Sequence, residues 1–459
     1  MKYFILILLV TFCLSAFSQD ESLLDRYINE ALENNPVLKQ KQLSYQKALY
    51  ELKEASGLFY PSLSIQARYT VAHGGRTFDI PVGDLMNPVY SSLHDITSTA
   101  YQFGIADQVF PDTSIDNQVV NFLREHEHET KAELVQPLFS PDIYYNRKIK
   151  KNMLRVQNAD IYTYKNYLIA EIKKAYFTFL KVCEYKQLLN DNHKLLEEYL
   201  RINKKLFEND KVTIDAVYRA ESELSKIDQL IASTEKDIIL STAYFNYLIG
   251  RPLDENIEKE NYDDLSSIFF SIDSAKSAAI QNRDELEQLE AFYDISESNI
   301  YRNKFNRLPE IFAVVDYGFQ GEEYSFTDKD DFVLASFVLK WNIFSGWQKS
   351  AQIQQAKIEK QIIENKRTDA EQKILMEVMS AYYDMQQSQK QIASAENELK
   401  YAESVFKIIK DKYKEGTATQ LEYLDAYTNQ MEANRKLIIE KYEYLIKQAE
   451  FERVISDNK

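Results

Sequence analysis

Two long stretches of the chain, residues 142–208 and 347–415, contain neither glycine nor proline. They are 67 and 69 residues long, and at a rise of about 1.5 Å per residue each would form a helix of roughly 100 Å. Helices in globular domains average only about 11 residues. Uninterrupted segments of this length therefore predict coiled coils or another special helical architecture.

Apolar residues within both stretches alternate spacings of three and four. The two series are Leu168, Ile172, Ala175, Phe179 and Val182, and Ile392, Ala395, Leu399, Ala402, Phe406, Ile409 and Tyr413. This spacing is typical of a heptad seam, which packs helices in left-handed supercoils. Ser140 followed by Pro141 suits an N-cap and a first helical residue, so the first long helix is predicted to begin there.

A segment with strand periodicity precedes each long helix. Leu63, Ile65, Ala67 and Tyr69 alternate with polar residues in the first segment, and Val333, Ala335, Phe337, Leu339 and Trp341 alternate in the last. Segments 131–139 and 311–319 are predicted to complete two strand hairpins. Strands of about ten residues suit a tilted crossing of a bilayer. Four strands cannot close a barrel, and open edges in lipid leave backbone groups unpaired, so several copies must share one barrel.

The first 18 residues have the pattern of a secretory signal peptide. Lys2 precedes an apolar run from Phe4 to Phe17, and small residues near its end predict cleavage after Ser18. A membrane anchor is the alternative, but the run is shorter than the roughly 20 residues that a spanning helix needs. The processed chain would keep only Cys183, which leaves no intrachain disulfide. The formal net charge of −16 argues against nucleic acid as a partner.

The sequence also repeats itself. Residues 31–34 (Ala-Leu-Glu-Asn) align with 279–282 (Ala-Ile-Gln-Asn) at an offset of 248, and 207–220 align with 413–426 at an offset of 206. These two alignments predict a first repeat over 19–250 and a second over 251–459. The change of offset places one insertion in the first repeat, predicted as a long turn-rich loop over 71–127 that lies outside the cell or folds into the barrel mouth.

Three segments in this order resemble the TolC family of outer-membrane efflux proteins: Glu30 to Pro36, Gln136 to Phe139, and Tyr413 to Ala426. The resemblance covers nearly all of the processed chain. It implies a mainly α protein with a membrane β part, in which three subunits give four strands each to a 12-stranded β-barrel that continues as a periplasmic α-helical barrel.

The function implied by this resemblance is that of an outer-membrane channel subunit. It would be a passive conduit for small molecules or proteins in a tripartite efflux or type I secretion system. The implied partners are two further copies in a homotrimer, a periplasmic adaptor, an inner-membrane transporter and outer-membrane lipid. No cofactor is implied.

The resemblance also places two turns at the periplasmic tip, where they would contact the adaptor. The first turn contains Asn209, Asp210 and Lys211, and the second contains Glu415, Gly416 and Thr417. Gly416 can adopt the positive φ that such a turn favours, and Asp210 stands where the family usually has glycine.

Acidic residues just beyond the tip are implied to form a ring at the narrowest point of the tunnel. The matching positions are Glu422 and Asp425, with Asp215 one position from the expected acid in the first repeat. Such a ring would favour cations and resist opening. The alternative is that these acids are solvated residues on helix surfaces.

Other functions have weaker support. His126 and His128 alternate among glutamates, but no third or fourth metal ligand can be placed, so a polar loop edge is favoured over a metal site. The chain has no phosphate-binding glycine loop, Gly-x-Ser-x-Gly elbow or His-Glu-x-x-His pair, and no enzyme is predicted. A periplasmic adaptor is disfavoured by the duplicated hairpin, and a structural coiled coil by the paired strands.

Overall fold

The computed structural model describes residues 22–260 and 271–456. The predicted signal peptide lies outside these residues. The chain forms two compact units, one built from residues up to Lys53, Tyr145–Asn303 and the segment from Ser350 onward, and the other from Glu54–Tyr144 and Lys304–Lys349. The first is called the helical unit and the second the strand unit. Both take elements from each sequence repeat.

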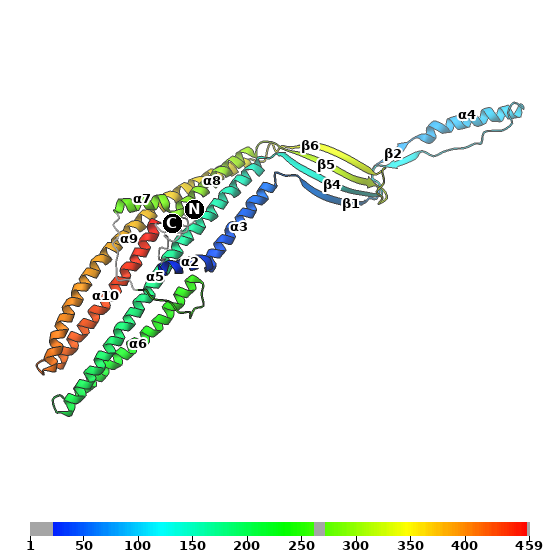
Figure 1. Ribbon diagram of the computed structural model, residues 1–459. Helices are drawn as coiled ribbons and strands as arrows, with labels where there is room; N and C mark the ends of the chain where they lie inside the picture. The colour runs from blue at the N-terminus through cyan, green and yellow to red at the C-terminus, as the bar shows by residue number, and fades with distance from the viewer. Residues whose placement is uncertain (1–21, 261–270, 457–459) are drawn as a thin grey trace, which may run out of the picture. The chain divides into compact units, whose positions relative to one another are not determined.

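Helices α2 and α3 lie at the start of the first predicted repeat, and α7 and α8 lie near the start of the second predicted repeat (Figure 1). The helices are α2 Leu23–Asn34, α3 Pro36–Gly57, α5 Pro141–Glu208, α6 Ile214–Ile249, α7 Ile272–Asn282, α8 Asp284–Phe305, α9 Gln348–Lys414 and α10 Gln420–Ile455. The 68 residues of α5 and the 67 residues of α9 confirm the long helices predicted from the breaker-free stretches. None of the helices in the described ranges combines the length and the apolar character that crossing a membrane requires.

The break between α2 and α3 follows from two residues. Asn35 places its side-chain Oδ1 2.9 Å from the backbone nitrogens of both Val37 and Leu38, which caps the start of α3. Pro36 is the first residue of α3, where its missing N–H breaks no helical hydrogen bond. The Asn35 amide also donates to the Leu248 carbonyl oxygen at 2.8 Å, so this capping residue ties α3 to the end of α6.

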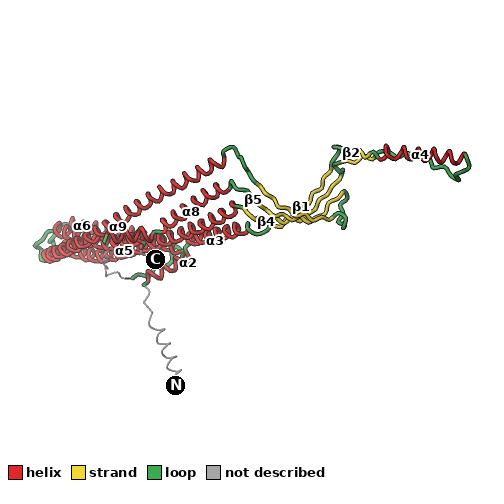
Figure 2. Tube along the Cα trace, turned by 90° about the horizontal axis from the view of Figure 1, so that it is seen from above, coloured by secondary structure: helices red, strands yellow, loops and turns green. Residues whose placement is uncertain are grey.

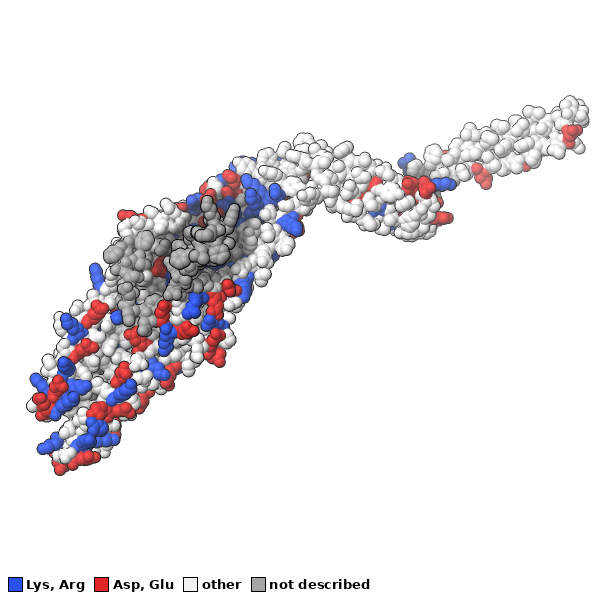
Figure 3. All heavy atoms as spheres, in the orientation of Figure 1, with Lys and Arg blue, Asp and Glu red and all other residues white. Residues whose placement is uncertain are grey.

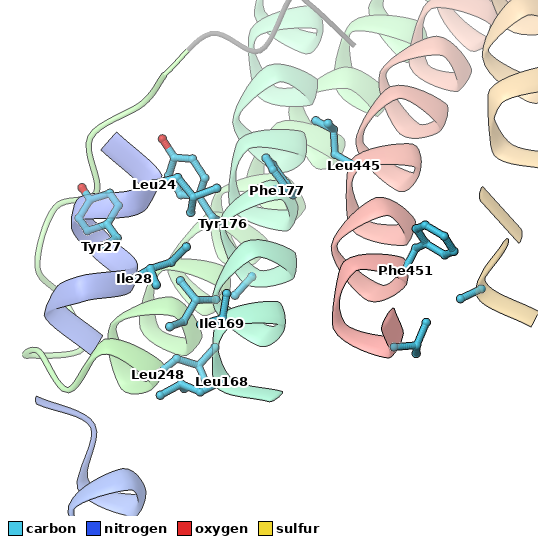
Figure 4. Close-up of a cluster of buried hydrophobic side chains, with 14 of the residues drawn as sticks. Leu24, Tyr27, Ile28, Leu168, Ile169, Tyr176, Phe177, Leu248, Leu445 and Phe451 are labelled. Carbon is cyan, nitrogen blue, oxygen red and sulfur yellow. The ribbon is translucent and has the colours of Figure 1, made fainter. Parts of the chain in front are cut away.

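The core of the helical unit is formed by the predicted seams. Every residue of both series is buried or half-buried, and Leu168, Ile172 and Ala395 are inaccessible to solvent. Figure 4 shows side chains of α2 beside those of α5, with α10 contributing Leu445 and Phe451 to the same cluster. Burying one such aliphatic side chain stabilises the fold by about 1.5–3 kcal/mol. The core therefore joins helices that are distant in sequence.

The strand unit contains a four-stranded antiparallel sheet with the order β1-β4-β5-β6 (Figures 1 and 2). Its strands are β1 Ser62–Val71, β4 His126–Phe139, β5 Glu310–Gly321 and β6 Asp331–Lys340. Both predicted hairpins are confirmed, and pairing of β4 with β5, as at Leu134 and Val315, joins them into one sheet. Within the described residues no further strand pairs with the outer edge of β1 or β6.

The insertion between β1 and β4 is folded, and the prediction of a turn-rich loop over 71–127 is wrong. It contains β2 Thr77–Ile80 and β3 Gln118–Asn121, which pair as a short ribbon, and helix α4 Val82–Gln102. Gly83 and Pro88 suggested turns, but both lie within the first two turns of α4. The helix forms because apolar residues recur behind them at helical spacing. We call residues 77–121 the arm.

His128 also differs from its prediction as a polar loop edge. It lies within β4 and is fully buried, because the rings of Tyr324 and Phe326 cover it with centroids 4.8 and 6.0 Å from its own. Neither ring nitrogen of His128 has a hydrogen-bond partner. Among the described residues no three His, Cys, Asp or Glu side chains cluster as a metal site would require.

Candidate functional site

The four-stranded sheet has one apolar face. In an antiparallel sheet, paired residues point to the same side, so the register assigns each side chain to a face. The apolar face carries Leu63, Ile65, Tyr69, Leu134, Val315, Tyr317, Val333, Phe337 and Leu339. Within the four strands this face holds no Lys, Arg or Glu, yet Ile65 is 80% exposed and Phe337 83% exposed. So large an uncovered apolar surface requires an apolar surrounding.

The opposite face of the sheet carries most of the charged side chains of the four strands, beside apolar residues such as Leu334 and Val338 of β6. Lys131 places its Nζ 2.7 Å from Asp316 Oδ2 and 3.5 Å from Glu133 Oε2. On the same face, Arg68 contacts Glu129 at 2.8 Å. The Arg68–Glu129 and Lys131–Asp316 pairs form a short ladder that links β1 to β4 and β4 to β5. A sheet with one apolar and one charged face suits a wall between lipid and an aqueous lumen.

Gly318 in β5 allows the strands to approach beside this ladder. It pairs with Lys131, and a Cβ atom at position 318 would lie 2.6 Å from the Lys131 Cβ. Real Cβ atoms do not approach this closely, so a larger residue would push the two central strands apart.

Charged side chains are distributed unevenly over the molecule. On the face drawn in Figure 3, Lys, Arg, Asp and Glu gather over the helical unit, whereas few of them lie over α4. The helical surfaces therefore suit water, in agreement with the predicted solvated faces of the long helices.

The two predicted tip turns have the same backbone geometry. Asp210 has φ 54° and Gly416 has φ 77°, so each adopts the left-handed conformation at the end of a long helix. The next residue in each turn donates its N–H to a carbonyl five residues earlier, Lys211 to Leu206 at 2.9 Å and Thr417 to Lys412 at 2.9 Å. This is a Schellman-type helix end. It reverses the chain from α5 into α6 and from α9 into α10.

We expect the two turns to respond differently to substitution. Gly416→Ala should destabilise its turn by about 1–2 kcal/mol, because a Cβ at positive φ meets the following carbonyl oxygen and nothing else lies within 4 Å. Asp210→Gly should be neutral or slightly stabilising locally, since glycine adopts this conformation freely. Hydrogen exchange of the tip amides measures the local stability of the turn in both variants. Equal protection in Gly416→Ala and the unmodified protein would contradict the strain argument.

Buried tyrosines join the two hairpins near the tips. The rings of Tyr199 in α5 and Tyr423 in α10 stack with centroids 4.5 Å apart and planes within 3°. Tyr413 in α9 donates its hydroxyl to Asn203 Oδ1 at 2.8 Å. Burial raises the pKa of the Tyr199 and Tyr423 hydroxyls, so both rings stay neutral. Sequence reasoning missed this cluster, because a tyrosine at a seam position looks like any other core residue.

Glu422 lies in the first turn of α10, where it completes a capping box with Thr419. Its carboxylate accepts hydrogen bonds from the Thr419 backbone N–H at 2.6 Å and from the Thr419 hydroxyl at 2.8 Å. These bonds, the backbone one first, hold the pKa of Glu422 below its usual value. The Thr-x-x-Glu pattern was readable in the sequence as a helix start.

The lowered pKa of Glu422 predicts a pH dependence of this helix start. The ionised carboxylate favours the folded cap, so its contribution is complete above the pKa of the unfolded chain and is lost as pH falls through the lower folded value. The protection of amides in the first turn of α10 against hydrogen exchange, relative to their intrinsic rate at each pH, should therefore be constant near neutral pH and fall only in strong acid. Loss of protection near neutral pH would contradict this assignment.

The other two predicted acids are exposed and lie near the start of α6 and α10. Asp425 lines a groove of about 330 Å³ between these helices, together with Arg219 of α6. Asp215 accepts a hydrogen bond from the Thr213 hydroxyl and lies 3.7 Å from the Arg219 guanidinium. Asp215 thus lies beside Arg219, Asp425 lines the same groove as that arginine, and Glu422 is held by its own helix cap.

Known proteins share this architecture. The chain superposes on the outer-membrane channel OprN with a TM-score of 0.76 at 15% identity, covering 95% of this chain and 90% of that one. The outer membrane protein VceC from Vibrio cholerae gives a TM-score of 0.74 at 15% identity, covering 94% of this chain and 95% of that one. The Campylobacter jejuni CmeC outer membrane channel gives a TM-score of 0.74 at 14% identity, covering 95% of this chain and 86% of that one. No sequence among the curated proteins matches this chain.

The chain therefore has the fold of these outer-membrane channel proteins, with long helices and a four-stranded sheet. Residues 276–455, which span most of the second predicted repeat, match the family described as outer membrane efflux protein. This match agrees with the family resemblance seen in the sequence.

Proposed function

We propose that three copies of this chain form one export channel through the outer membrane. The observation that carries the proposal is the two-faced sheet with two unpaired edges. Its apolar face suits lipid, its charged face suits a lumen, and the free edges of β1 and β6 must pair with neighbouring copies when the sheet is in lipid. Three copies would close a barrel of 12 strands, with the charged face inside.

The helical unit supports association of copies. Besides the buried seam, α9 carries a second row of large apolar side chains that is exposed in the single chain: Met376, Met379, Tyr383, Tyr401, Val405 and Ile408. Their spacing places them along one side of the helix. In a trimer this row would pack against a neighbouring copy, and the long helices would continue the barrel as an α-helical tunnel into the periplasm.

The proposed activity is passive conduction, with no catalysis and no cofactor. Export of a substrate then needs an energised partner, so we propose that the tips around Asp210 and Gly416 contact a periplasmic adaptor that connects to an inner-membrane transporter. The proposed location, the outer membrane with a periplasmic extension, requires export of the chain and fits the predicted cleavage after Ser18. We also propose that the chain consists of two repeats, residues 19–250 and 251–459.

Planar-bilayer recording tests the channel function. The purified protein, added at low concentration, should produce stepwise conductance increases of uniform size, because each step is one inserted trimer. Protein heated until unfolded is the control and should produce none. A folded preparation that binds the bilayer but never conducts would overturn the proposed function.

We further propose that the tip acids Glu422, Asp425 and Asp215 surround the narrow end of the tunnel. Three copies would bring nine carboxylates to one axis, which favours cations. The variant Glu422→Gln with Asp425→Asn removes two charges per chain and keeps the capping box, since glutamine can replace glutamate there. We expect lower cation selectivity and weaker block by divalent cations.

A matched control for these acids is Glu403→Gln with Asp411→Asn. These exposed residues lie in α9, the other helix of the same hairpin, and the pair changes the net charge equally. Its selectivity should equal that of the unmodified protein, because screened surface charges contribute little. If both double variants conduct alike, the acids do not line the constriction.

A further inference from the structure

Helix α4 of the arm is covered on one side by the segment that follows it. Asn87 exchanges two hydrogen bonds with the backbone of Ile115, at 2.8 and 2.9 Å. His94 Nδ1 lies 2.7 Å from the Phe110 carbonyl oxygen, and the Phe110 N–H donates to Thr97 Oγ1 at 2.9 Å. The returning segment therefore follows the line of residues 87, 94 and 97 along the helix.

The opposite side of α4 is an uncovered apolar stripe formed by Leu85, Val89, Leu93 and Ile96. At about 100° per residue these positions cluster on the side turned away from the returning segment. Leu85 is 69% exposed and Ile96 is 65% exposed. The spacings of four, four and three resemble those of a coiled-coil seam. An exposed row of this kind on a folded helix indicates a surface that another structure covers.

The charges of the arm limit what can cover this stripe. Residues 77–123 contain six aspartates and no Lys, Arg or Glu. Helices that lie on membranes usually carry Lys or Arg on their polar side to meet anionic headgroups, and α4 has the opposite charge. Its two acids lie off the stripe: Asp84 accepts a hydrogen bond from the Asn117 side-chain amide of the returning segment at 3.0 Å, and Asp95 is exposed on another side of the helix. Two identical stripes can therefore meet without bringing charges face to face.

The chain path brings copies of the arm together. Five residues separate the end of β1 at Val71 from the start of β2, and four separate β3 from the start of β4 at His126. Since β1 is an edge strand, each arm leaves the sheet beside a subunit boundary of the proposed trimer, at the end of β1 remote from α3. Threefold symmetry would place all three arms on one rim, at high effective concentration.

We propose that the apolar stripes of the three α4 helices pack against one another and form a three-helix cap over the outer end of the barrel. This inference rests on the proposed trimer. The cap would stand at the end of the strands opposite the helical tips, where it would narrow or guide the exit of the channel.

Cysteine cross-linking in isolated outer membranes tests the cap. Ile96→Cys is introduced in a Cys183→Ala background and treated with a short bismaleimide. The matched control is Ser91→Cys, an exposed position on the side of α4 away from the stripe. We expect on the order of tenfold more cross-linked dimer from Ile96→Cys than from Ser91→Cys, because only the stripe would hold cysteines of neighbouring copies together.

The trimer is measured on the same samples by native mass in mild detergent. Equal cross-linking at the two positions in an intact trimer would overturn the cap and leave the proposed channel unaffected. Absence of the trimer would instead overturn the proposed function. A bimane probe on Ile96→Cys gives a second readout: quenching by nitroxide lipids would show that the stripe enters the membrane, and shielding from both lipid and aqueous quenchers would support the cap.

Discussion

Replacing Ala395 by proline is expected to abolish folded trimer. Ala395 lies inside α9, which ends at Lys414, and has no exposed surface. Proline there removes a helical hydrogen bond, and its ring clashes with the carbonyl four residues earlier, at a cost of about 3 kcal/mol or more per chain. The buried seam leaves no room for the helix to kink outward. Semi-native gels of outer membranes, which separate trimer from monomer, measure the loss.

The matched control is Ile214→Pro at the first residue of α6. The preceding Thr213 has φ −84° and ψ 162°, the extended conformation that a residue before proline adopts. Proline is favoured at a first helical position, where its missing N–H breaks no helical bond. This variant should assemble normally. A normal trimer yield from Ala395→Pro would mean that α9 is not a continuous helix in the assembled protein.

The second large effect concerns the apolar face of the sheet. Ile65→Lys places a cation on the proposed lipid side in the middle of β1, which costs about 2–4 kcal/mol per chain near the bilayer midplane. Three copies multiply this cost, so we expect little trimer in the outer membrane. Extraction with alkaline carbonate followed by immunoblotting measures the inserted fraction.

The neighbouring position gives a control for this substitution. Ser64→Lys adds the same charge on the opposite face, where its backbone partner Glu133 can pair with it. Insertion of this variant should remain close to that of the unmodified protein. If Ile65→Lys and Ser64→Lys insert equally well, the two faces of the sheet are not in different solvents.

Much of this fold was predictable because its periodicities are long. The heptad seam through Ile392 and Tyr413 and the strand alternation through Leu63 and Tyr69 each extend over many residues. In both cases the period of the apolar residues determines which side chains share one face. Positive φ at Gly416 was predicted from the residue type, and Asp210 adopts it because short polar side chains tolerate that conformation.

Other features depended on contacts that local sequence does not reveal. Helix α4 was missed because Gly83 and Pro88 suggested turns, although the helix contains both, with Pro88 in its interior. The burial of His128 results from aromatic residues almost 200 positions later in the chain. For the tip acids, the sequence indicated their positions, and the bonds of Glu422 to Thr419 show the capping role that the Thr-x-x-Glu spacing allows.

The association of three copies through their sheet edges is the central claim, and native mass spectrometry in mild detergent tests it most directly. The unmodified protein, extracted from outer membranes, should give a single species of three times the mass of one chain, and that species should dissociate only on unfolding. Within one chain β1 and β6 are separated by two strands, so they can pair only with other copies. A stable, folded monomer under these conditions would contradict the account.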